Sequence, residues 1–395
     1  MRQAAPYGQT GPQGPRGPYR VVIAPDKFKG SLTAPDVAAH LARGLAAAVP
    51  GIRTDEIPIA DGGDGTVDAA VAAGYRRVEG RVSGPTGEPV TAAFAISSPG
   101  DVAVVEAAQA CGLSRLPGGQ LRPLTATSYG VGELIAAALD AGAWHIVLGL
   151  GGSATTDGGA GLIAALGARL LDAAGQPVPP GGAALAGLRM LDLSSLRDLS
   201  GVDVLLASDV DNPLLGPDGA AAVYGPQKGA SAADIAVLED GLARWASMAE
   251  AALGRGFRER AGAGAAGGLG FAALAFLGAR VRPGIEVVLE LVSFSKRVAG
   301  TSLVITGEGS LDAQTLRGKA PAGVASAARA ASPETPVVAV AGSCSLDEES
   351  LAGAGLAAAY ALTSLEPDVR SSMANAGPLL ERLAAHVAAD WLPPS

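Results

Sequence analysis

The sequence predicts an α/β protein with two domains: a doubly wound parallel-sheet domain of the flavodoxin or Rossmann type, and a mixed-sheet α/β domain inserted into it. Near both ends of the chain, short apolar segments alternate with helix-length amphipathic segments, which is the βαβ pattern of a parallel sheet. In the middle, an alternating apolar and polar segment is typical of a half-exposed strand. We assign residues 20–80 and 296–395 to the first domain, residues 81–295 to the insertion and residues 1–19 to a disordered tail.

The first elements are clearly marked. Residues 21–25 form a short apolar strand that a proline ends. Thr33 and Asp36 have the spacing of a capping box, and the apolar residues after them recur at helical spacing. A second strand is expected to end at residues 57–60, and the run Asp-Gly-Gly-Asp-Gly at residues 61–65 then opens a helix rich in alanine and valine.

Further strands are expected along the rest of the chain. They are the alternating segment 90–96 and the apolar segments 145–150, 202–208, 302–307 and 336–342. The last two return the chain to the α/β pattern of its beginning. The uncharged stretch 261–279 has the length of a membrane span, but its glycine and alanine content favours a close-packed segment within a soluble protein.

The composition argues against several classes of function. The chain has 395 residues, of which 48% are hydrophobic and 4% aromatic, and a net charge of −9. Nucleic acids and anionic membranes bind basic protein surfaces, and this chain is acidic. We therefore expect neither a nucleic acid nor a membrane as a partner. Two cysteines are too few for a disulfide framework, and residues 1–19 lack the apolar core of a secretion signal. We expect a soluble cytoplasmic protein.

The loop at residues 149–159 is the strongest candidate for binding an anion. It joins an apolar strand to a helix and contains five glycines and three hydroxyl side chains. Small side chains let backbone N–H groups converge on an anion, and the following helix adds partial positive charge. A tight turn with Asp157 as a helix cap is the alternative. The residues expected to bind substrate or phosphate in this loop are Gly151, Gly152, Ser153, Thr155, Thr156 and Asp157.

Known nucleotide-binding motifs fit the chain poorly. A P-loop needs Gly-Lys followed by Ser or Thr, whereas residues 318–320 are Gly-Lys-Ala. The relaxed dinucleotide fingerprint occurs at residues 149–154 and the strict form at residues 262–267, but neither has the expected strand–helix–strand surroundings. A nicotinamide-dependent oxidoreductase and a non-catalytic small-anion-binding protein stay open as alternative functions.

Lysine is scarce, which makes its positions informative. Only five of the 29 basic residues are lysines. Four of these lie in glycine-rich polar loops, namely Lys27, Lys29, Lys228 and Lys319. A compact ammonium group on a flexible stem suits a phosphate that moves during transfer, whereas arginine suits a fixed bidentate contact. The pattern therefore favours phosphate chemistry over chance placement in exposed loops.

Acidic residues stand in pairs where strands are expected to end. The pairs are Asp61 with Asp64, Asp209 with Asp211, and Glu308 with Asp312. Open α/β sheets bind ligands at the carboxyl ends of their strands, so these side chains are candidates for one site. Mg²⁺ takes one or two carboxylates together with phosphate oxygens, which such pairs offer. Turns and helix caps are the alternative role for each single acid.

Several segments together resemble the bacterial type I glycerate kinase family. The resemblance rests on blocks in the family's order at residues 24–32, 60–66, 127–130, 149–161, 208–214, 224–230, 262–270, 282–286 and 306–312. It implies two α/β domains facing a cleft, and ATP- and Mg²⁺-dependent phosphorylation of D-glycerate to 2-phosphoglycerate, with 3-phosphoglycerate as the alternative product. It also implies D-glycerate and ATP as partners, and we expect a monomer or a homodimer.

These residues suggest roles in phosphoryl transfer, which needs positioning, cations on the transferred oxygens and a carboxylate near the attacking hydroxyl. We expect Asp209 to be the base and Asp61, Asp64 and Asp211 to hold Mg²⁺. We expect Lys27, Lys29 and Lys319 to neutralise phosphate charge. The 149–159 loop, Lys228, Glu308 and Asp312 are expected to bind phosphate or the glycerate carboxylate.

Overall fold

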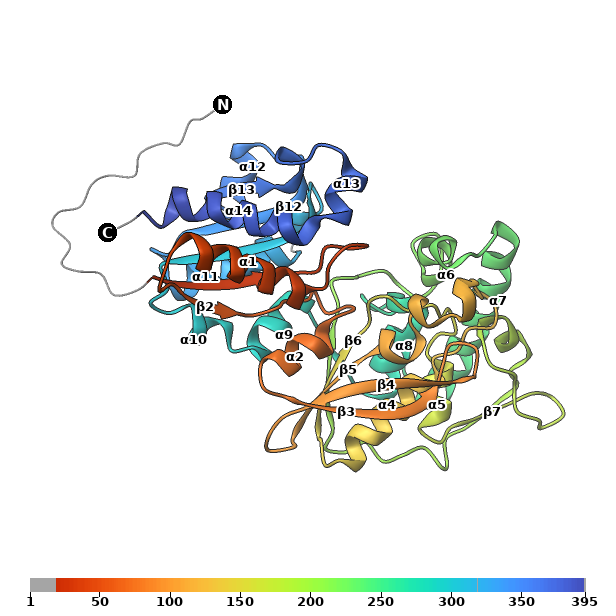
Figure 1. Cartoon of the computed structure of the whole chain (residues 1–395). Coiled ribbons are helices and arrows are strands. Elements are labelled where there is room, and N and C mark those ends of the chain that lie inside the picture. Colours follow the sequence, from red (N-terminus) through yellow and green to blue (C-terminus); the bar gives the residue numbers. More distant parts are fainter. Residues whose placement is uncertain (1–18, 318, 394–395) are drawn as a thin grey trace.

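The computed structural model describes residues 19–317 and 319–393, which form two lobes, each built around a β-sheet (Figure 1). One sheet is entirely parallel and the other is mixed, and helices cover both. The predicted fold class is confirmed. The predicted tail lies outside the described residues except for Tyr19, whose carbonyl oxygen accepts a hydrogen bond of 2.8 Å from Arg53 N.

Sheet A of the first lobe has five parallel strands in the order β13-β12-β11-β1-β2. Counted along this lobe, the order is 2-1-3-4-5, the flavodoxin type, which places a ligand crevice beyond the carboxyl ends of β1 and β11. The bounds are β1 Arg20–Pro25, β2 Arg53–Glu56, β11 Leu303–Leu311, β12 Val337–Cys344 and β13 Ala358–Ala361.

Helices bury both faces of sheet A. Val21 and Ile23 of β1 face α1 and α14, whereas Val22 and Ala24 face the helices of the opposite side. The predicted capping box starts α1, because the side chains of Thr33 and Asp36 each accept a hydrogen bond from the other's backbone N–H. The bounds are α1 Ala34–Ala48, α9 Gly284–Leu291, α10 Phe294–Val298, α11 Ala320–Ala331, α12 Glu348–Gly353, α13 Val369–Ala374 and α14 Ala376–Trp391.

Sheet C of the second lobe has six strands in the order β10-β9-β6-β5-β4-β3. The first four run parallel, and β4 and β3 are antiparallel to their neighbours. The bounds are β3 Arg76–Ser83, β4 Pro89–Ile96, β5 Val102–Glu106, β6 His145–Gly149, β9 Asp203–Ala207 and β10 Arg280–Arg282; β7 Arg169–Leu171 and β8 Met190–Asp192 form a separate pair.

The helices of the second lobe surround its main core. That core lies on one face of sheet C, under α4, α5, α7 and α8. The stretch without charge at residues 261–279 contains α8, which is buried along almost its whole length. The bounds are α2 Thr66–Ala72, α3 Ala107–Cys111, α4 Tyr129–Asp140, α5 Ala160–Ala165, α6 Ala220–Tyr224, α7 Ala232–Leu253 and α8 Ala265–Phe276.

Two helices, α2 and α9, connect the lobes. In α9, Ile285 and Val288 belong to the core under sheet A, whereas Val287 packs with Val104 and Val147 on the second face of sheet C. The domain boundaries near residues 81 and 296 stay predictions. Because α9 already packs on the first lobe, we propose that the chain returns to that lobe at Pro283 rather than at residue 296.

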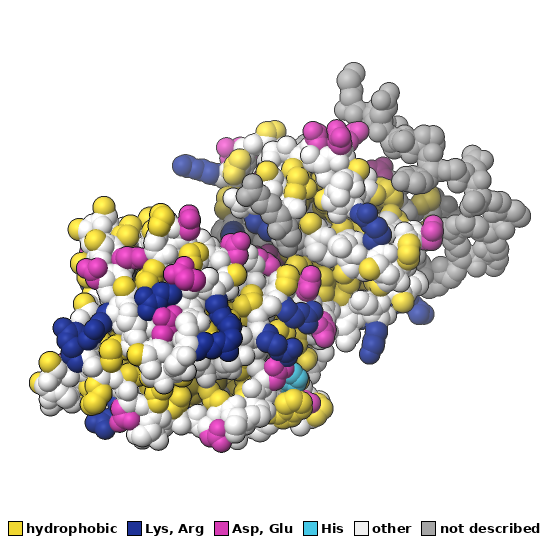
Figure 2. Space-filling model, turned by 180° about the vertical axis from the view of Figure 1, so that it is seen from behind, with side chains coloured by type: hydrophobic (Ala, Val, Ile, Leu, Met, Phe, Trp, Pro, Cys, Tyr) yellow, Lys and Arg dark blue, Asp and Glu magenta, His cyan; other side chains and the backbone are white. Residues whose placement is uncertain are grey.

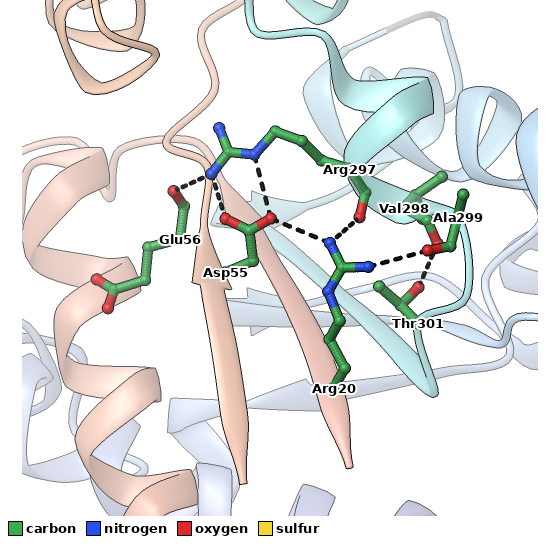
Figure 3. A network of polar contacts seen from close by, with 7 residues as sticks. All are labelled: Arg20, Asp55, Glu56, Arg297, Val298, Ala299 and Thr301. Carbon is green, nitrogen blue, oxygen red and sulfur yellow. Dashed lines mark hydrogen bonds and ion pairs between the residues drawn. The ribbon is translucent and has the colours of Figure 1, made fainter. Parts of the chain in front are cut away.

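A polar network connects α10 and the segment after it to strands β1 and β2 of sheet A (Figure 3). Arg297 of α10 binds the carboxylate of Asp55 on β2 and donates a hydrogen bond of 3.1 Å to the carbonyl oxygen of Glu56. Arg20 of β1 donates to the carbonyl oxygens of Ala299 and Arg297 at 2.9 and 2.8 Å. The network thus joins β1, β2 and the segment that leads into β11.

The surface carries charges of both signs. On the face shown in Figure 2, basic and acidic side chains are interspersed over both lobes. None of the helices in the described part of the chain combines the length and the apolar character needed to cross a membrane.

Candidate functional site

Two cavities lie at the carboxyl ends of the sheets, and Asp61 lines both. The sheet-A cavity, of about 290 Å³, lies beyond the strand ends of the first lobe. The junction cavity, of about 250 Å³, lies between the loop that carries Asp61 and the strand ends of the second lobe. A molecule in one cavity would therefore approach a molecule in the other at Asp61.

The sheet-A cavity gathers charged side chains from four segments. Six residues that the sequence predicts for the site line it: Lys27, Lys29, Asp61, Glu308, Asp312 and Lys319. They meet because β1 and β11 are neighbours in sheet A, although β1 ends at Pro25 and β11 begins only at Leu303. Lys319 is the residue before α11, and its Nζ lies 3.7 Å from the Glu308 carboxylate.

The carboxylates of this cavity repel one another. Burial raises the pKa of Asp26 to about 6; the nearby Lys27 ammonium opposes that shift, and the charges of Asp61 and Glu308 add to it. Burial also raises the pKa of Glu308, against a hydrogen bond of 2.5 Å from the Thr315 hydroxyl and the charge of Lys319. A cation placed between these groups would relieve the repulsion.

The junction cavity contains a buried lysine. Lys228 is 2% exposed, and its Nζ donates to the Thr155 carbonyl oxygen at 2.6 Å and to Ser153 Oγ at 3.3 Å. Burial lowers the pKa of Lys228 to about 8. Among the described residues, Lys27 and Lys319 form ion pairs with carboxylates, and Lys228 forms none. With a third donor available and no carboxylate partner, this ammonium group suits an anion.

Predicted residues on two further segments line the same cavity. Gly151, Gly152 and Ser153 come from the loop after β6, and Asp209 follows β9. One oxygen of Asp209 accepts a hydrogen bond of 3.1 Å from Gly284 N. Burial raises the pKa of Asp209, the bond from Gly284 opposes the shift, and the charge of Asp61 adds to it.

Backbone-to-backbone contact explains the glycines at this junction. A Cβ atom on Gly284 would lie 1.9 Å from the Asp61 carbonyl oxygen, and one on Gly151 would lie 2.5 Å from the Cα of Gly63. Only residues without a side chain allow the three segments to approach so closely. This contact fixes Asp61 between the two cavities.

Asp157, Thr155 and Thr156 belong to the buried part of the 149–159 loop and do not line the junction cavity. Both Asp157 oxygens are occupied, because they accept hydrogen bonds from the backbone and hydroxyl of Ser128 and from Gly159 N and Gly161 N. The hydroxyl oxygens of Thr155 and Thr156 are buried without a hydrogen-bond partner. We therefore propose that Asp157 holds the backbone before and within the first turn of α5, whose N-cap residue is Gly159, rather than binding phosphate.

Two of the predicted metal ligands line neither of these two cavities; Asp64 lines a neighbouring cavity of about 310 Å³, which also contains Asp26, Lys27 and Lys29. Asp211 is exposed, and its charge adds to the burial that raises the pKa of Tyr224. Asp64 lies beside the carboxyl group of Glu106, while its carbonyl oxygen accepts a hydrogen bond of 2.5 Å from Lys27 Nζ. We therefore propose neither carboxylate as a ligand to Mg²⁺.

The sequence prediction missed Asp26, which lines the sheet-A cavity, and Glu106, which lines neither cavity but positions the loop that carries Asp61. Asp26 follows β1 directly, beside Lys27, and this position was the available signal. Glu106 is the one charge that ends the apolar run of β5. Its Oε2 accepts hydrogen bonds of 3.1 and 3.2 Å from Gly65 N and Val67 N, which ties the loop carrying Asp61 to sheet C.

A model of the glycerate kinase family matches residues 21–392. The chain belongs to the glycerate kinase family. It is 47% identical over 372 residues to a glycerate kinase of Bacillus subtilis (strain 168), covering 94% of this chain and 97% of that protein. It is 44% identical over 331 residues to glycerate 2-kinase of Escherichia coli (strain K12), covering 83% and 86%.

A solved structure agrees with this glycerate kinase membership. The crystal structure of a protein assigned as glycerate kinase 2 from Salmonella typhimurium LT2 matches with a TM-score of 0.79 and 42% identity, covering 94% of this chain and 99% of that one. The predicted family is confirmed, and with it the predicted class of enzyme, a kinase.

The glycerate kinase fold gives neither dinucleotide fingerprint its usual surroundings. After the fingerprint at residues 149–154, β7 pairs antiparallel with β8 instead of joining sheet C. The fingerprint at residues 262–267 lacks a preceding strand, because residues 254–261 contain none. Neither segment therefore forms the βαβ unit of a nicotinamide-binding site.

The acidic residues of the sheet-A cavity fit a metal that phosphate helps to hold. Among the residues described, no three His, Cys, Asp or Glu side chains gather into a complete metal site. However, Mg²⁺ usually takes one or two carboxylates and completes its shell with phosphate oxygens and water. Asp26 and Asp61 offer such a pair, since the charge of Asp61 raises the pKa of Asp26.

Proposed function

We propose that the protein transfers the γ-phosphoryl group of ATP to the C2 hydroxyl of D-glycerate, with 2-phosphoglycerate and ADP as products. The observation that carries this proposal is that Asp61 lines both a cavity with three lysines and a cavity with one buried lysine. The first suits a triphosphate and the second a small carboxylate. The names of the B. subtilis and E. coli relatives support glycerate as the substrate and C2 as the position.

The glycerate carboxylate binds at Lys228 in this proposal. The buried ammonium group supplies one positive charge, and the small residues Gly151 and Gly152 leave room for an anion beside the backbone. Because water is largely excluded there, one ion pair and its hydrogen bonds are worth more than they would be at the surface. The hydroxyl groups of glycerate then point toward Asp209 and Asp61.

The triphosphate lies across the strand ends of sheet A. Lys27, Lys29 and Lys319 neutralise its charge, as the sequence predicted. Asp26 and Asp61 are the carboxylates that would hold Mg²⁺, which when bound neutralises charge on the phosphate oxygens.

Asp209 orients the attacking hydroxyl and accepts its proton. Its bond to Gly284 N fixes the carboxylate at the junction, and its raised pKa brings it closer to a useful value for a base. As the hydroxyl oxygen bonds to the γ-phosphorus, the bond from that phosphorus to the bridging oxygen breaks and ADP leaves. The proton passes from the hydroxyl to Asp209.

Phosphorus NMR of the product tests the proposal. The protein is incubated with ATP, Mg²⁺ and D-glycerate, and ADP release is followed in a coupled assay. We expect ADP release that depends on D-glycerate, and a product spectrum that matches authentic 2-phosphoglycerate. The spectrum of 3-phosphoglycerate would contradict the proposed position, and glycerate binding without ADP release would favour the anion-binding alternative. A thermal shift with nicotinamide cofactors would favour the oxidoreductase.

A further inference from the structure

The sheet-A cavity extends along the whole carboxyl edge of the sheet. Its lining includes Asp61 after β2, Lys27 after β1, Glu308 on β11, Gly342 on β12 and Leu362 after β13. Neighbouring strands are about 4.8 Å apart, so the four steps from β2 to β13 span roughly 19 Å. That length is comparable with an extended nucleoside triphosphate and much greater than the triphosphate group alone.

The two ends of this cavity differ in chemistry. The end near β2, β1 and β11 carries the lysines and carboxylates described above. Leu362 follows β13, and α13 and the start of α14 add Val369, Met373 and Ala376 to an apolar wall that borders residues 30 and 31 after β1. Val369 and Met373 are 57% and 42% exposed, although they are large apolar residues. In Figure 1, α13, which carries both, lies over the sheet on the side of β12 rather than of β2.

The apolar end is firmly attached to the loop that carries Lys29. The hydroxyl of Ser31 donates a hydrogen bond of 2.8 Å to the Met373 carbonyl oxygen. A Cβ atom on Gly30 would lie 3.1 Å from the Met373 methyl carbon, so the two segments are in close contact. The side chain of Asp368 caps α13 through a bond of 2.8 Å from Ser371 N. The exposed side chains therefore project from a fixed wall.

We infer that the base of the nucleotide binds at the β13 end of the sheet-A cavity, against Leu362, Val369 and Met373, with the triphosphate directed toward Asp61. This inference rests on the proposed function, which supplies the nucleotide. The orientation follows from the topology: the γ-phosphate must reach Asp61 to meet glycerate, so the base must occupy the opposite end. Apolar side chains there would contact the faces of an aromatic ring.

Substitution of Met373 tests this base site. In Met373→Ala we expect the KM and the Kd for ATP to rise roughly tenfold through loss of apolar contact, with little change in the KM for glycerate. Binding of inorganic triphosphate, measured by calorimetry, should be unchanged because it uses only the lysine end. Met190→Ala is the matched control, since Met190 is similarly exposed, at 48%, and lines neither cavity. Val369→Ala should act in the same direction as Met373→Ala.

The outcomes separate the base site from the proposed reaction. If Met373→Ala and Val369→Ala both keep the wild-type Kd for ATP while folding normally by circular dichroism, the base site is overturned, even in an active kinase. If both variants weaken ATP and inorganic triphosphate equally, the orientation is overturned. If the wild-type protein fails to phosphorylate glycerate but binds ATP in a Met373-dependent manner, the base site stands and the proposed reaction fails.

Discussion

Replacing Glu106 by glutamine should make the stability of the protein less sensitive to pH. Glu106 is completely buried, and burial, followed by the charge and the carboxyl group of Asp64, raises its pKa from the ordinary 4.5 to about 8. Bonds from Val67 N and Gly65 N oppose the shift. The unfolded chain releases this proton near pH 4.5, whereas the folded protein keeps it until about pH 8. Folded protein therefore binds one more proton between these values, and its stability falls as the pH rises.

The size of the effect follows from the shift. One proton of difference changes the free energy of unfolding by about 1.4 kcal/mol per pH unit, so the wild-type protein should lose about 3 kcal/mol between pH 5.5 and pH 8 through this group. Glutamine does not titrate. Its side-chain oxygen can still accept from Gly65 N and Val67 N, and its amide group can donate to Asp64. In Glu106→Gln this part of the pH dependence should be absent.

Urea unfolding of both proteins at pH 5.5, 7 and 8 measures the difference. Stability of Glu106→Gln relative to wild type should rise steadily with pH. Glu250→Gln is the matched control: burial acts to raise the pKa of Glu250, but bonds from Arg258 and the backbone leave it lowered. It is ionised throughout this range, so its substitution should shift stability by a constant amount. If the curves for Glu106→Gln and wild type run parallel, the buried carboxyl does not hold a proton at neutral pH.

The remaining predictions concern the site and the lobe junction. Asp209→Asn should lower kcat by at least roughly 100-fold with a modest change in KM, and near-normal turnover in steady-state kinetics would remove Asp209 from the role of base. The KM for glycerate should rise above pH 8, where Lys228 loses its charge, and a constant KM from pH 7 to 9.5 would argue against that ion pair. Gly284→Ala should cost about 1–3 kcal/mol of stability, measured by urea unfolding, because its Cβ would clash with the Asp61 carbonyl oxygen. Gly353→Ala, whose Cβ meets nothing within 4 Å at the end of α12, should not lower stability.

Local signals in the sequence identified most elements that build the site. The apolar runs that became β1, β6, β9, β11 and β12 were each marked by a proline, glycine or acidic residue at the carboxyl end. The Thr33 capping box could be predicted because its partners are three residues apart. Parallel strand ends converge by geometry, so Lys27, Asp61 and Glu308 could be expected in one place before any distance was known.

Contacts between distant segments could not be predicted in the same way. Nothing near Glu106 in the sequence indicates that Asp64 and the start of α2 will lie beside it. Likewise, the residues around Asp157 in the sequence are the same whether it binds phosphate or holds the backbone of its own loop; the position of Ser128, from another segment, decides between the two roles. The role of a polar side chain depended on the partner that the fold brings to it.

The position of the insertion also sets the order in which the chain can fold during synthesis. Strand β1 lies between β2 and β11, and the ribosome makes more than two hundred residues of the second lobe before it reaches Leu303. Two strands alone are too small a sheet to be stable. The N-terminal segment therefore stays exposed, because its apolar strand β1 still lacks its partner β11, while the second lobe can fold as soon as it emerges. We expect chaperones to bind the nascent chain at this exposed apolar segment.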